Sequence, residues 1–433
     1  MASWATRQAM KLGAMKLLLI HQNFPGQYKH LAPELARLGH EVVALTPKVK
    51  KPALWNGVKL LPYAISGGST RGIHPFLTDF ETKILRGTSC YQAALALRQQ
   101  GFQPDVILAH HGWGESLFLK DVWPKARLGL YCELYHLTSA DFIAFDPEFS
   151  QIDSVTEPLR IRMKNLNNRL HEEVMDAGIS PTRFQAGTFP EHWRDRITVA
   201  HDGIDTDLVK PDPQAKLEVT QGRILTRDDE VITFINRNLE PYRGYHVFMR
   251  ALPEILRRRP HAHVTLIGGD EVSYGSRPPE GQTWKQIFID EVKDQITPED
   301  WARVHFLGRV PYDRFLSMMQ VSRVHVYLTY PFVLSWSLLE AMSAGCAILA
   351  SDTAPVREAL TEDDTGWMVD FFDRAALVDR LCALLDDPAT RARLGAKARR
   401  VAQDTYDLRR ICLPQHLAWV EGLAARTPRA PRD

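Results

Sequence analysis

Short apolar runs alternate with helical patterns along most of this chain. A continuous apolar run at residues 16–21 is followed by turn residues, by leucines at helical spacing that stop at Gly39, and by a second apolar run at residues 41–46. Short buried runs separated by an amphipathic helix predict a β-α-β unit. Repeated alternation of this kind predicts a parallel sheet with helices on both faces.

The alternation occurs twice. The first series ends near residue 201 and the second begins near residue 231, and residues 202–213 between them are polar and rich in turn formers. A chain of 433 residues also exceeds what one hydrophobic core usually organises. We expect strands at residues 16–21, 41–46, 105–110, 127–134, 197–201, 231–236, 263–267, 304–307, 324–328 and 347–351, and helices at residues 80–99, 157–175, 245–258, 312–320, 337–344, 373–386, 388–404 and 413–423.

The predicted fold class is therefore α/β, with two doubly wound, Rossmann-like domains facing across a cleft. Ligands of such sheets bind outside the carboxyl ends of the strands. We expect an N-terminal domain at residues 15–205, a C-terminal domain at residues 206–410, and a helix and tail at residues 411–433. Residues 1–14 are expected to be an extension or a vector-derived tag, with Met15 as the original start.

Composition excludes several classes of protein. Basic and acidic residues number 53 and 52, so no strong field is available to gather nucleic acid. Five scattered cysteines without a C-x-x-C pair indicate neither a disulfide framework nor a zinc site, and they favour a cytoplasmic location. No secretory signal and no apolar run long enough to cross a membrane is found. The lysines at positions 48–59 fit either a solvated loop or a peripheral contact with acidic headgroups at the inner face of a membrane.

Two arginines follow the first predicted strand of the second domain. Arg237 comes directly after the strand and Arg243 six residues later, at the start of the next helix. Guanidiniums that converge there would bind a diphosphate through bidentate, charge-assisted hydrogen bonds. Two solvated loop arginines are the alternative.

A second cluster covers residues 329–345. A strand ends near Leu328, and a helix begins at about Ser335 to Ser337, where unpaired backbone N–H groups attract phosphate. Glu340 would lie one turn inside this helix, where its carboxylate could accept bonds from a ribose diol. Alternatively, Ser337 and Glu340 form a capping box that only satisfies the helix end.

Six motifs in order resemble family four of the retaining glycosyltransferases, which have the GT-B fold. They are the Gln-Asn-Phe-Pro-Gly-Gln run at 22–27, typical of a variant branch, the segment at 35–42, the two arginines, Ile-Gly-Gly-Asp at 267–270, Phe-Leu-Gly-Arg-Val at 306–310, and Leu-Leu-Glu-Ala-Met-Ser-Ala-Gly at 338–345. The resemblance covers about residues 15 to 410. It implies that the C-terminal helix returns to the N-terminal domain.

The resemblance also implies roles for individual residues. Arg237 and Arg243 would bind the donor diphosphate, with arginine at 243 where the family has lysine, and His110 would position the donor sugar and complete the catalytic set. The implied donor-binding residues are Gly26, Gly268, Arg309, Val310, Leu334, Ser335, Trp336 and Glu340. Independently of the resemblance, Glu133, Tyr135 and His111 are assigned to the acceptor because they lie near the ends of two predicted strands.

One position departs from the family pattern. A second glutamate is expected eight residues before Glu340, and Phe332 stands there instead. The usual polar contact to the donor sugar is therefore absent or supplied by another group, which leaves the donor sugar open.

The predicted activity is retaining transfer of a sugar from a UDP- or GDP-sugar to a hydroxyl of a saccharide, lipid-linked or other glycoconjugate acceptor. We expect no metal ion and no cofactor beyond this donor substrate. A bacterial polysaccharide pathway is the setting that the resemblance implies. Two alternatives stay open: a nucleotide-sugar-binding protein without transfer activity, and a GT-B sugar-nucleotide epimerase. Base, linkage and oligomeric state are not determined by these residues.

Overall fold

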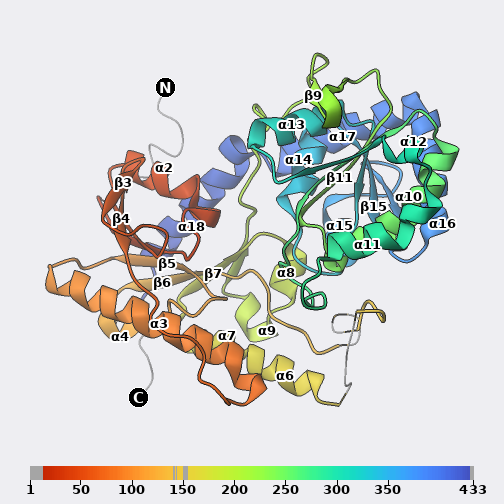
Figure 1. The fold of residues 1–433 in the computed structure, drawn as a ribbon. Coiled ribbons are helices and arrows are strands. Elements are labelled where there is room, and N and C mark those ends of the chain that lie inside the picture. The colour runs from red at the N-terminus through yellow and green to blue at the C-terminus, as the bar shows by residue number, and fades with distance from the viewer. Residues whose placement is uncertain (1–12, 140–141, 143, 150–154, 430–433) are drawn as a thin grey trace, which may run out of the picture. The chain divides into compact units, whose positions relative to one another are not determined.

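The computed structural model describes residues 13–139, 142, 144–149 and 155–429, which form two compact units (Figure 1). The N-unit comprises residues 1–143, 152–202 and 409–433. The C-unit comprises residues 203–408 together with the short segment 144–151. The chain therefore leaves the N-unit for a few residues between β6 (Arg127–Tyr131) and α6 (Glu157–Lys164), which no feature of the sequence pattern indicated.

The described part of the N-unit contains one sheet in the order β3-β4-β2-β1-β5-β6-β7-β8, parallel except at its β3 edge. β1 lies between β2 and β5, so the connections diverge to either side of the carboxyl end of β1. The strands are β1 (Lys16–Ile20), β2 (Glu41–Thr46), β3 (Ala53–Trp55), β4 (Val58–Pro62), β5 (Val106–His110), β6 (Arg127–Tyr131), β7 (Ala177–Ser180) and β8 (Ile197–Val199).

Helices cover both faces of this sheet because alternate side chains of its central strand enter different cores. Leu17 and Leu19 belong to a core with α2 and α18, whereas Leu18 and Ile20 belong to a core with α3 and α4. The helices are α2 (Leu31–Arg37), α3 (Pro75–Gln99), α4 (Leu119–Val122), α6 (Glu157–Lys164), α7 (Leu166–Val174), α8 (Arg183–Gly187), α9 (Glu191–Arg194) and α18 (Leu413–Ala424). α18, the last helix, thus packs in the N-unit.

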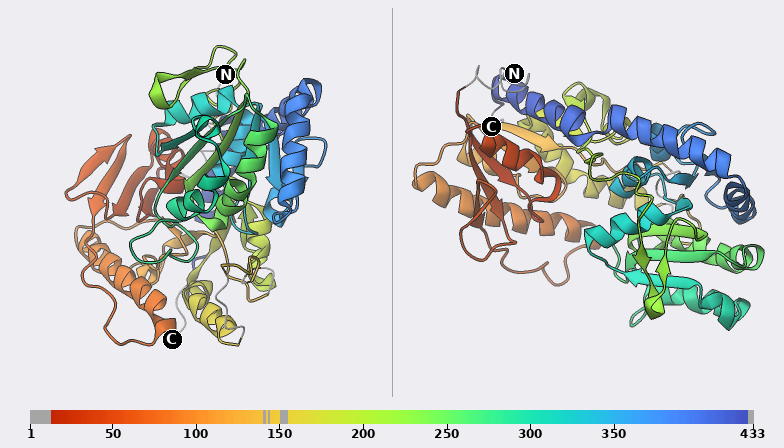
Figure 2. Two further views of the ribbon diagram at one scale, coloured as in Figure 1. Left: turned by 45° about the vertical axis from the view of Figure 1, so that its right-hand side comes forward. Right: turned by 90° about the horizontal axis from the view of Figure 1, so that it is seen from above.

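The C-unit contains a parallel sheet in the order β13-β12-β11-β14-β15-β16, with β11 between β12 and β14. Its strands are β11 (Val231–Asn238), β12 (His263–Gly269), β13 (Val304–Gly308), β14 (Val324–Tyr327), β15 (Ala347–Ser351) and β16 (Trp367–Val369), and a separate antiparallel pair consists of β9 (Leu217–Glu218) and β10 (Ile224–Leu225). Its helices are α10 (Tyr245–Arg258), α11 (Trp284–Val292), α12 (Pro298–Trp301), α13 (Tyr312–Val321), α14 (Trp336–Ser343), α15 (Ala354–Ala359), α16 (Arg374–Asp386) and α17 (Pro388–Thr405). They lie on both faces of the sheet (Figure 2).

The two doubly wound parallel sheets confirm the predicted fold class. Strands β4, β7 and β16 and helix α11 were not predicted, because each is short or lacks a clear period. The helix expected at 157–175 is two helices, α6 and α7, which meet at Asn165. There the Asn165 side chain bonds both backbone groups of His136. Within the described residues, no helix combines the length and apolar content needed to span a membrane.

Candidate functional site

The carboxyl end of β11 is the point of the C-unit where the connections diverge, and ligands of open α/β sheets bind at such points. Arg237 lies at this end of β11, and its side chain is exposed. Within the described part of the chain, its guanidinium forms neither a hydrogen bond nor an ion pair. A cation that no described residue pairs with at this position is available to an anionic ligand.

Arg243 is held differently, inside a polar and aromatic pocket of the C-unit. It belongs to the turn Pro241–Arg243 and is only 5% exposed. Its Nη1 donates to Thr329 Oγ1 at 2.6 Å, and its guanidinium carbon lies 5.3 Å from the ring centre of Tyr274 and 5.6 Å from that of Phe332. Both distances allow a cation–π interaction. The guanidinium is therefore fixed in position before any ligand binds.

The residue after Arg243 must be glycine. Gly244 has φ +70°, and a Cβ atom there would lie 2.2 Å from Cβ of Leu328. The turn can therefore approach the end of β14, which brings Arg243 to Thr329.

Phe332 takes part in this arrangement although it departs from the family pattern. Besides the Arg243 guanidinium, its ring packs on Tyr242 at 5.0 Å and on Tyr274 at 4.9 Å between centroids. An aromatic face therefore lies beside the buried arginine where the resemblance led us to expect a carboxylate.

Glu240 anchors the loop that carries Tyr274, a role that the sequence analysis missed. Its carboxylate is 1% exposed and accepts hydrogen bonds from the backbone N–H groups of Ser273, Tyr274 and Gly275 at 3.1–3.4 Å. Burial raises the pKa of Glu240, although these amides and Arg243 act in the opposite direction. The acidic residue three positions before Arg243 was the only sign of this role in the sequence.

The loop from 329 to 335 ends at the N-terminus of α14. Ser335 caps this helix by accepting a hydrogen bond from Ser337 N at 3.3 Å, and the N–H of Ser335 donates to Tyr327 Oη. Trp336 is 42% exposed, whereas the Leu334 side chain is buried in the core. Leu334 can therefore contribute only backbone groups to a ligand.

Glu340 does not cap α14. The N-cap is Ser335 rather than Ser337, so the capping-box alternative is wrong. Glu340 Oε1 instead accepts a hydrogen bond from Tyr312 Oη at 2.7 Å, and the side chain is partly exposed. Its carboxylate is within reach of a ligand at the start of the helix.

The remaining C-unit candidates lie at the ends of β12 and β13. Arg309 Nη2 donates to Asn238 Oδ1 at 3.1 Å and to Glu271 Oε2 at 2.5 Å, which ties it to the end of β11. Gly268 is buried in β12, where a Cβ atom would lie 2.8 Å from the Leu239 side chain. Val310 packs partly on the core. Arg309 thus lies near the carboxyl end of β11, which carries Arg237. Gly268 allows the Leu239 side chain to pack closely on β12.

In the N-unit the corresponding point is the carboxyl end of β1. Gly26 has φ +46°, and a Cβ atom would lie 2.1 Å from the His21 ring, so the loop after β1 must carry glycine there. His21 Nδ1 accepts from Asn23 N, and Nε2 bonds Gln27 Oε1 at 2.5 Å. The loop is therefore fixed by its own histidine, and the backbone at Gly26 stays close to it.

His110, at the end of β5, is buried and stacks on Trp113 with 3.8 Å between ring centres. Its Nδ1 accepts from Gly112 N at 3.0 Å, so in the neutral ring the proton is on Nε2, which lies 3.3 Å from Glu133 Oε2. This orients Nε2 toward the end of β6. Trp113, which no motif indicated, fixes the plane of the ring.

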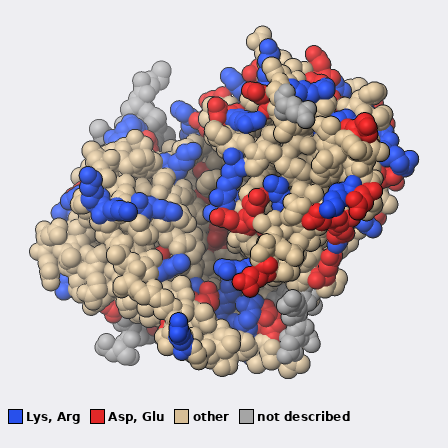
Figure 3. Space-filling model, viewed as in Figure 1, with Lys and Arg blue, Asp and Glu red and all other residues tan. Residues whose placement is uncertain are grey.

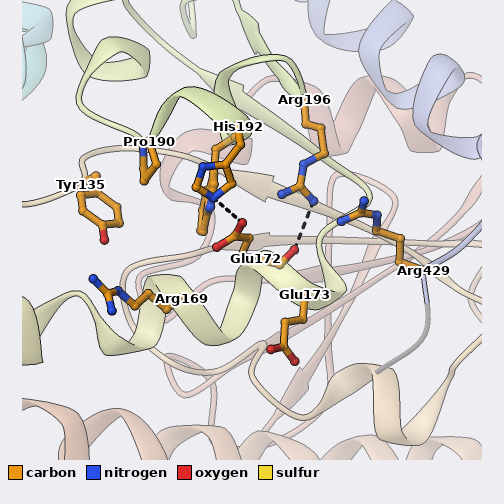
Figure 4. A pocket seen from close by; sticks show the side chains of 9 residues that line it. Tyr135, Arg169, Glu172, Glu173, Pro190, His192, Arg196 and Arg429 are labelled. Carbon is orange, nitrogen blue, oxygen red and sulfur yellow. Dashed lines mark hydrogen bonds and ion pairs between the residues drawn. The ribbon is translucent and has the colours of Figure 1, made fainter. Parts of the chain in front are cut away.

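The two other residues assigned to the acceptor differ in position. His111 is 2% exposed and bonds Asn168 Oδ1 and the N–H of Leu134, so it has a structural role in this unit. Tyr135 lines a cavity of about 850 Å³ (Figure 4). The other side chains that line it are Arg169, Glu172, Glu173, Pro190, His192, Trp193, Arg196 and Arg429, with His192 directed at Glu172.

Buried histidines in the N-unit predict a strong dependence of stability on pH. Burial lowers the pKa of His21, His171 and His416 to about 4, from a usual value near 6.5. The unfolded chain then binds more protons than the folded one between these values, so stability falls as the pH drops from about 6.5 to about 4. At pH 5 each of these three histidines should lower the free energy of unfolding by on the order of 2 kcal/mol relative to neutral pH.

Urea unfolding at pH 7.5 and pH 5 measures this effect. We expect the urea concentration at the unfolding midpoint to be much lower at pH 5 than at pH 7.5. In a His416→Gln variant, the difference between the two midpoints should be smaller. Equal midpoints at the two pH values would contradict the neutral, buried state of these rings.

An Asp-x-Asp sequence at Asp205-Thr206-Asp207 follows the N-unit. Asp205 Oδ1 accepts from Leu208 N at 3.2 Å, and Thr206 donates to Asp407. The first bond closes a turn, and the second ties this turn to a residue 201 positions later in the chain. Among the residues that the structure describes, no group of three or more His, Cys, Asp or Glu side chains is placed to hold a metal ion.

The chain is similar to known proteins along both units. Residues 38–209 match the family model described as Glycosyl transferase family 4 group, and residues 220–401 match Glycosyl transferases group 1. A D-inositol 3-phosphate glycosyltransferase of Corynebacterium efficiens is 27% identical over 205 residues, which are 47% of this chain and 46% of that protein. The protein of the same name from Corynebacterium diphtheriae is 26% identical over 85% of this chain and 82% of its own.

A GDP-mannose-dependent alpha-(1-6)-phosphatidylinositol monomannoside mannosyltransferase of Mycolicibacterium smegmatis is 26% identical over 48% of this chain and 52% of that protein. The chain thus spans only about half the length of several of these relatives.

Solved structures agree on the fold. Sucrose-phosphate synthase from Thermosynechococcus elongatus has a TM-score of 0.70 at 16% identity, covering 95% of this chain and all of that one. Anabaena HepE in complex with UDP-glucose has a TM-score of 0.64 at 14% identity, covering 94% and 99%. With these structures the chain shares the GT-B fold, and each of its two halves contains a region similar to a glycosyl transferase family model.

Proposed function

We propose that the protein transfers a sugar from a nucleoside diphosphate sugar to a hydroxyl of a saccharide, lipid-linked or other glycoconjugate acceptor, with retention of the anomeric configuration. The observation that carries the proposal is the pair of arginines at the carboxyl end of β11. Arg237 is exposed and has no partner among the described residues, and Arg243 is held rigidly beside Thr329. Together with the N-terminus of α14, they form a site for a diphosphate.

In the proposed reaction, the bond between the anomeric carbon and the diphosphate oxygen breaks while a bond to the acceptor oxygen forms on the same face. The acceptor hydroxyl gives its proton to a phosphate oxygen of the departing nucleoside diphosphate. The arginines stabilise the negative charge that grows on this leaving group. No protein nucleophile and no cofactor takes part in this scheme. We further propose, from the resemblance alone, that His110 orients the sugar through Nε2.

The names of similar proteins support the choice of donor class. One relative is named as GDP-mannose-dependent, and HepE was crystallised with UDP-glucose. We therefore propose a UDP- or GDP-sugar as the donor. Several relatives act on D-inositol 3-phosphate according to their names, so a phosphorylated polyol belongs among the acceptors to be tested.

Binding and product analysis test the proposal. Selective binding raises the unfolding temperature by mass action, so a panel of UDP-, GDP-, ADP- and TDP-sugars should single out one donor. NMR of the product made from that donor should show an unchanged anomeric configuration. A donor that binds without any transfer would favour the binding-protein alternative, and an epimer formed without acceptor would favour the epimerase.

We also propose a peripheral contact with acidic lipids through the hairpin of β3 and β4. Lys48, Lys50, Lys51 and Lys59 are exposed there and Leu54 is 77% exposed, and Figure 3 shows basic side chains over this hairpin. Each lysine near an anionic surface contributes about 1 kcal/mol. The protein should sediment with vesicles containing phosphatidylglycerol but not with pure phosphatidylcholine, and replacing Lys48, Lys50 and Lys51 by Glu should abolish this. Equal sedimentation of that variant would contradict the proposal.

A further inference from the structure

The segment 144–149 follows β6 of the N-unit in the chain, yet it packs in the C-unit. Phe145 contacts Tyr330, Phe371 and Phe372, with 5.0–5.3 Å between ring centres. At the other end, Phe149 contacts a second set of rings, His246, Trp284 and Phe288. Two aromatic anchors therefore hold the segment on both sides of its central acidic residue.

That residue, Asp146, is buried at 4% exposure and fully bonded. Its Oδ2 lies 3.0 Å from His246 Nε2 and accepts from Tyr330 Oη at 2.5 Å, while Oδ1 accepts from Glu148 N at 3.0 Å. Burial alone would raise the pKa of Asp146, but the bonds to His246, Tyr330 and the Glu148 amide lower it below its usual range. The carboxylate is thus ionised at neutral pH and able to fix the Tyr330 hydroxyl.

Tyr330 belongs to the loop that holds Arg243. Its neighbour Thr329 accepts the 2.6 Å hydrogen bond from Arg243. Its own N–H donates to the carbonyl oxygen of Tyr242 at 3.2 Å, and the two rings pack with 4.7 Å between centres. Tyr242 in turn packs on Phe332, whose face covers the Arg243 guanidinium.

Asp146 therefore bonds one end of a continuous set of packed rings, and Arg243 lies at the other end. Loss of the bond would leave the Tyr330 ring held by ring packing alone and would weaken its support of Tyr242 and Phe332. The aromatic surround of Arg243 would then become less ordered, and part of the binding free energy of an anion would be spent on ordering it again.

We propose that Asp146 is a positioning residue of the donor site, which acts through the hydroxyl of Tyr330 to hold the aromatic surround of Arg243. The inference rests on the proposed function, since it assumes that Arg243 binds a diphosphate. It assigns to a segment of the first half of the chain a part in nucleotide binding by the second half.

Calorimetry with UDP and GDP, the probes nearest to the proposed leaving group, tests the proposal on the full chain. We expect Asp146→Asn and Tyr330→Phe each to raise the Kd of the nucleotide that binds by about 5- to 20-fold, with donor KM following and kcat changing less. The double variant should bind the nucleotide about as weakly as Asp146→Asn alone, because the hydrogen bond that Tyr330→Phe removes is already perturbed by Asp146→Asn.

Glu148→Gln is the matched control. Glu148 lies in the same segment and forms a two-pronged ion pair with Arg250 of α10 at 2.6 and 2.7 Å, but its side chain forms no hydrogen bond with Tyr330 among the described residues. Its Kd should stay within twofold of that of the unchanged protein. If Glu148→Gln weakens binding as much as Asp146→Asn, docking of the segment matters and the specific role of Asp146 is wrong.

The remaining outcomes separate the two proposals. Unchanged Kd in folded Asp146→Asn and Tyr330→Phe variants would overturn the positioning role while leaving the proposed function intact. If the unchanged protein binds neither UDP, GDP nor any sugar nucleotide, the proposed function itself fails. Should Asp146→Asn not fold, Tyr330→Phe decides, since it removes the same hydrogen bond and keeps the ring.

Discussion

Replacing Arg237 by alanine should lower kcat about a hundredfold, the usual effect of removing one group that stabilises charge in a transition state. The arginine is exposed and has no hydrogen-bond or ion-pair partner among the described residues, so the unfolding temperature should not change. The rate is measured with the donor that the binding panel selects. The kcat of Arg237→Lys should lie between that of the unchanged protein and that of Arg237→Ala, because lysine keeps the charge but not the forked geometry of guanidinium.

Arg400→Ala provides a matched control for this variant. Arg400 lies on α17, is exposed, and likewise lacks a hydrogen-bond or ion-pair partner in the described part of the chain. Its loss removes the same charge from the same unit, so a general electrostatic effect would lower both rates equally. Turnover in Arg237→Ala equal to that in Arg400→Ala would reject the role of Arg237 in the reaction.

The second large effect is expected at Glu340. Glu340→Gln keeps the size of the side chain but removes the charge that would strengthen its hydrogen bonds to a ribose diol. Hydrogen bonds to charged groups contribute about 1.5–3 kcal/mol, so the donor KM should rise about tenfold or more. Because the ribose is remote from the reacting bond, kcat should change less.

The nucleotide itself provides a sharper test of the contact. Unchanged protein should bind UDP or GDP more tightly than the 2′-deoxy analogue, and Glu340→Gln should lose most of that preference. Tyr312→Phe, which removes only the hydroxyl that bonds Glu340, should keep it. If Glu340→Gln discriminates as well as the unchanged protein, Glu340 does not bind the ribose.

The structure shows what Phe332 contacts at the position where the sequence departs from the family motif. In the sequence it stands where the family has a glutamate, which left the donor sugar open. In the structure its ring lies against the Arg243 guanidinium and the rings of Tyr242 and Tyr274. This packing gives the position a defined role next to the proposed diphosphate site.

The sequence was sufficient for the fold class and for the places where chemistry is concentrated. Apolar periodicity is a local record of burial, so β1, β5, β11 and β14 could be located within a few residues, and Arg237 could be placed at the end of its strand. Gly26 was one of the turn residues expected after the first apolar run, and the structure gives it a positive φ of 46°. These features depend on neighbours in the chain, which a single sequence displays.

Tertiary structure alone decided which polar groups pair. The hydrogen bond from Tyr330 to Asp146 joins residues 184 positions apart, and the one from Arg243 to Thr329 spans 86. Of two adjacent histidines, His110 is directed at Glu133 whereas His111 is bound to Asn168. Such pairing depends on how strands and loops from distant parts of the chain come together, and periodicity carries no record of that.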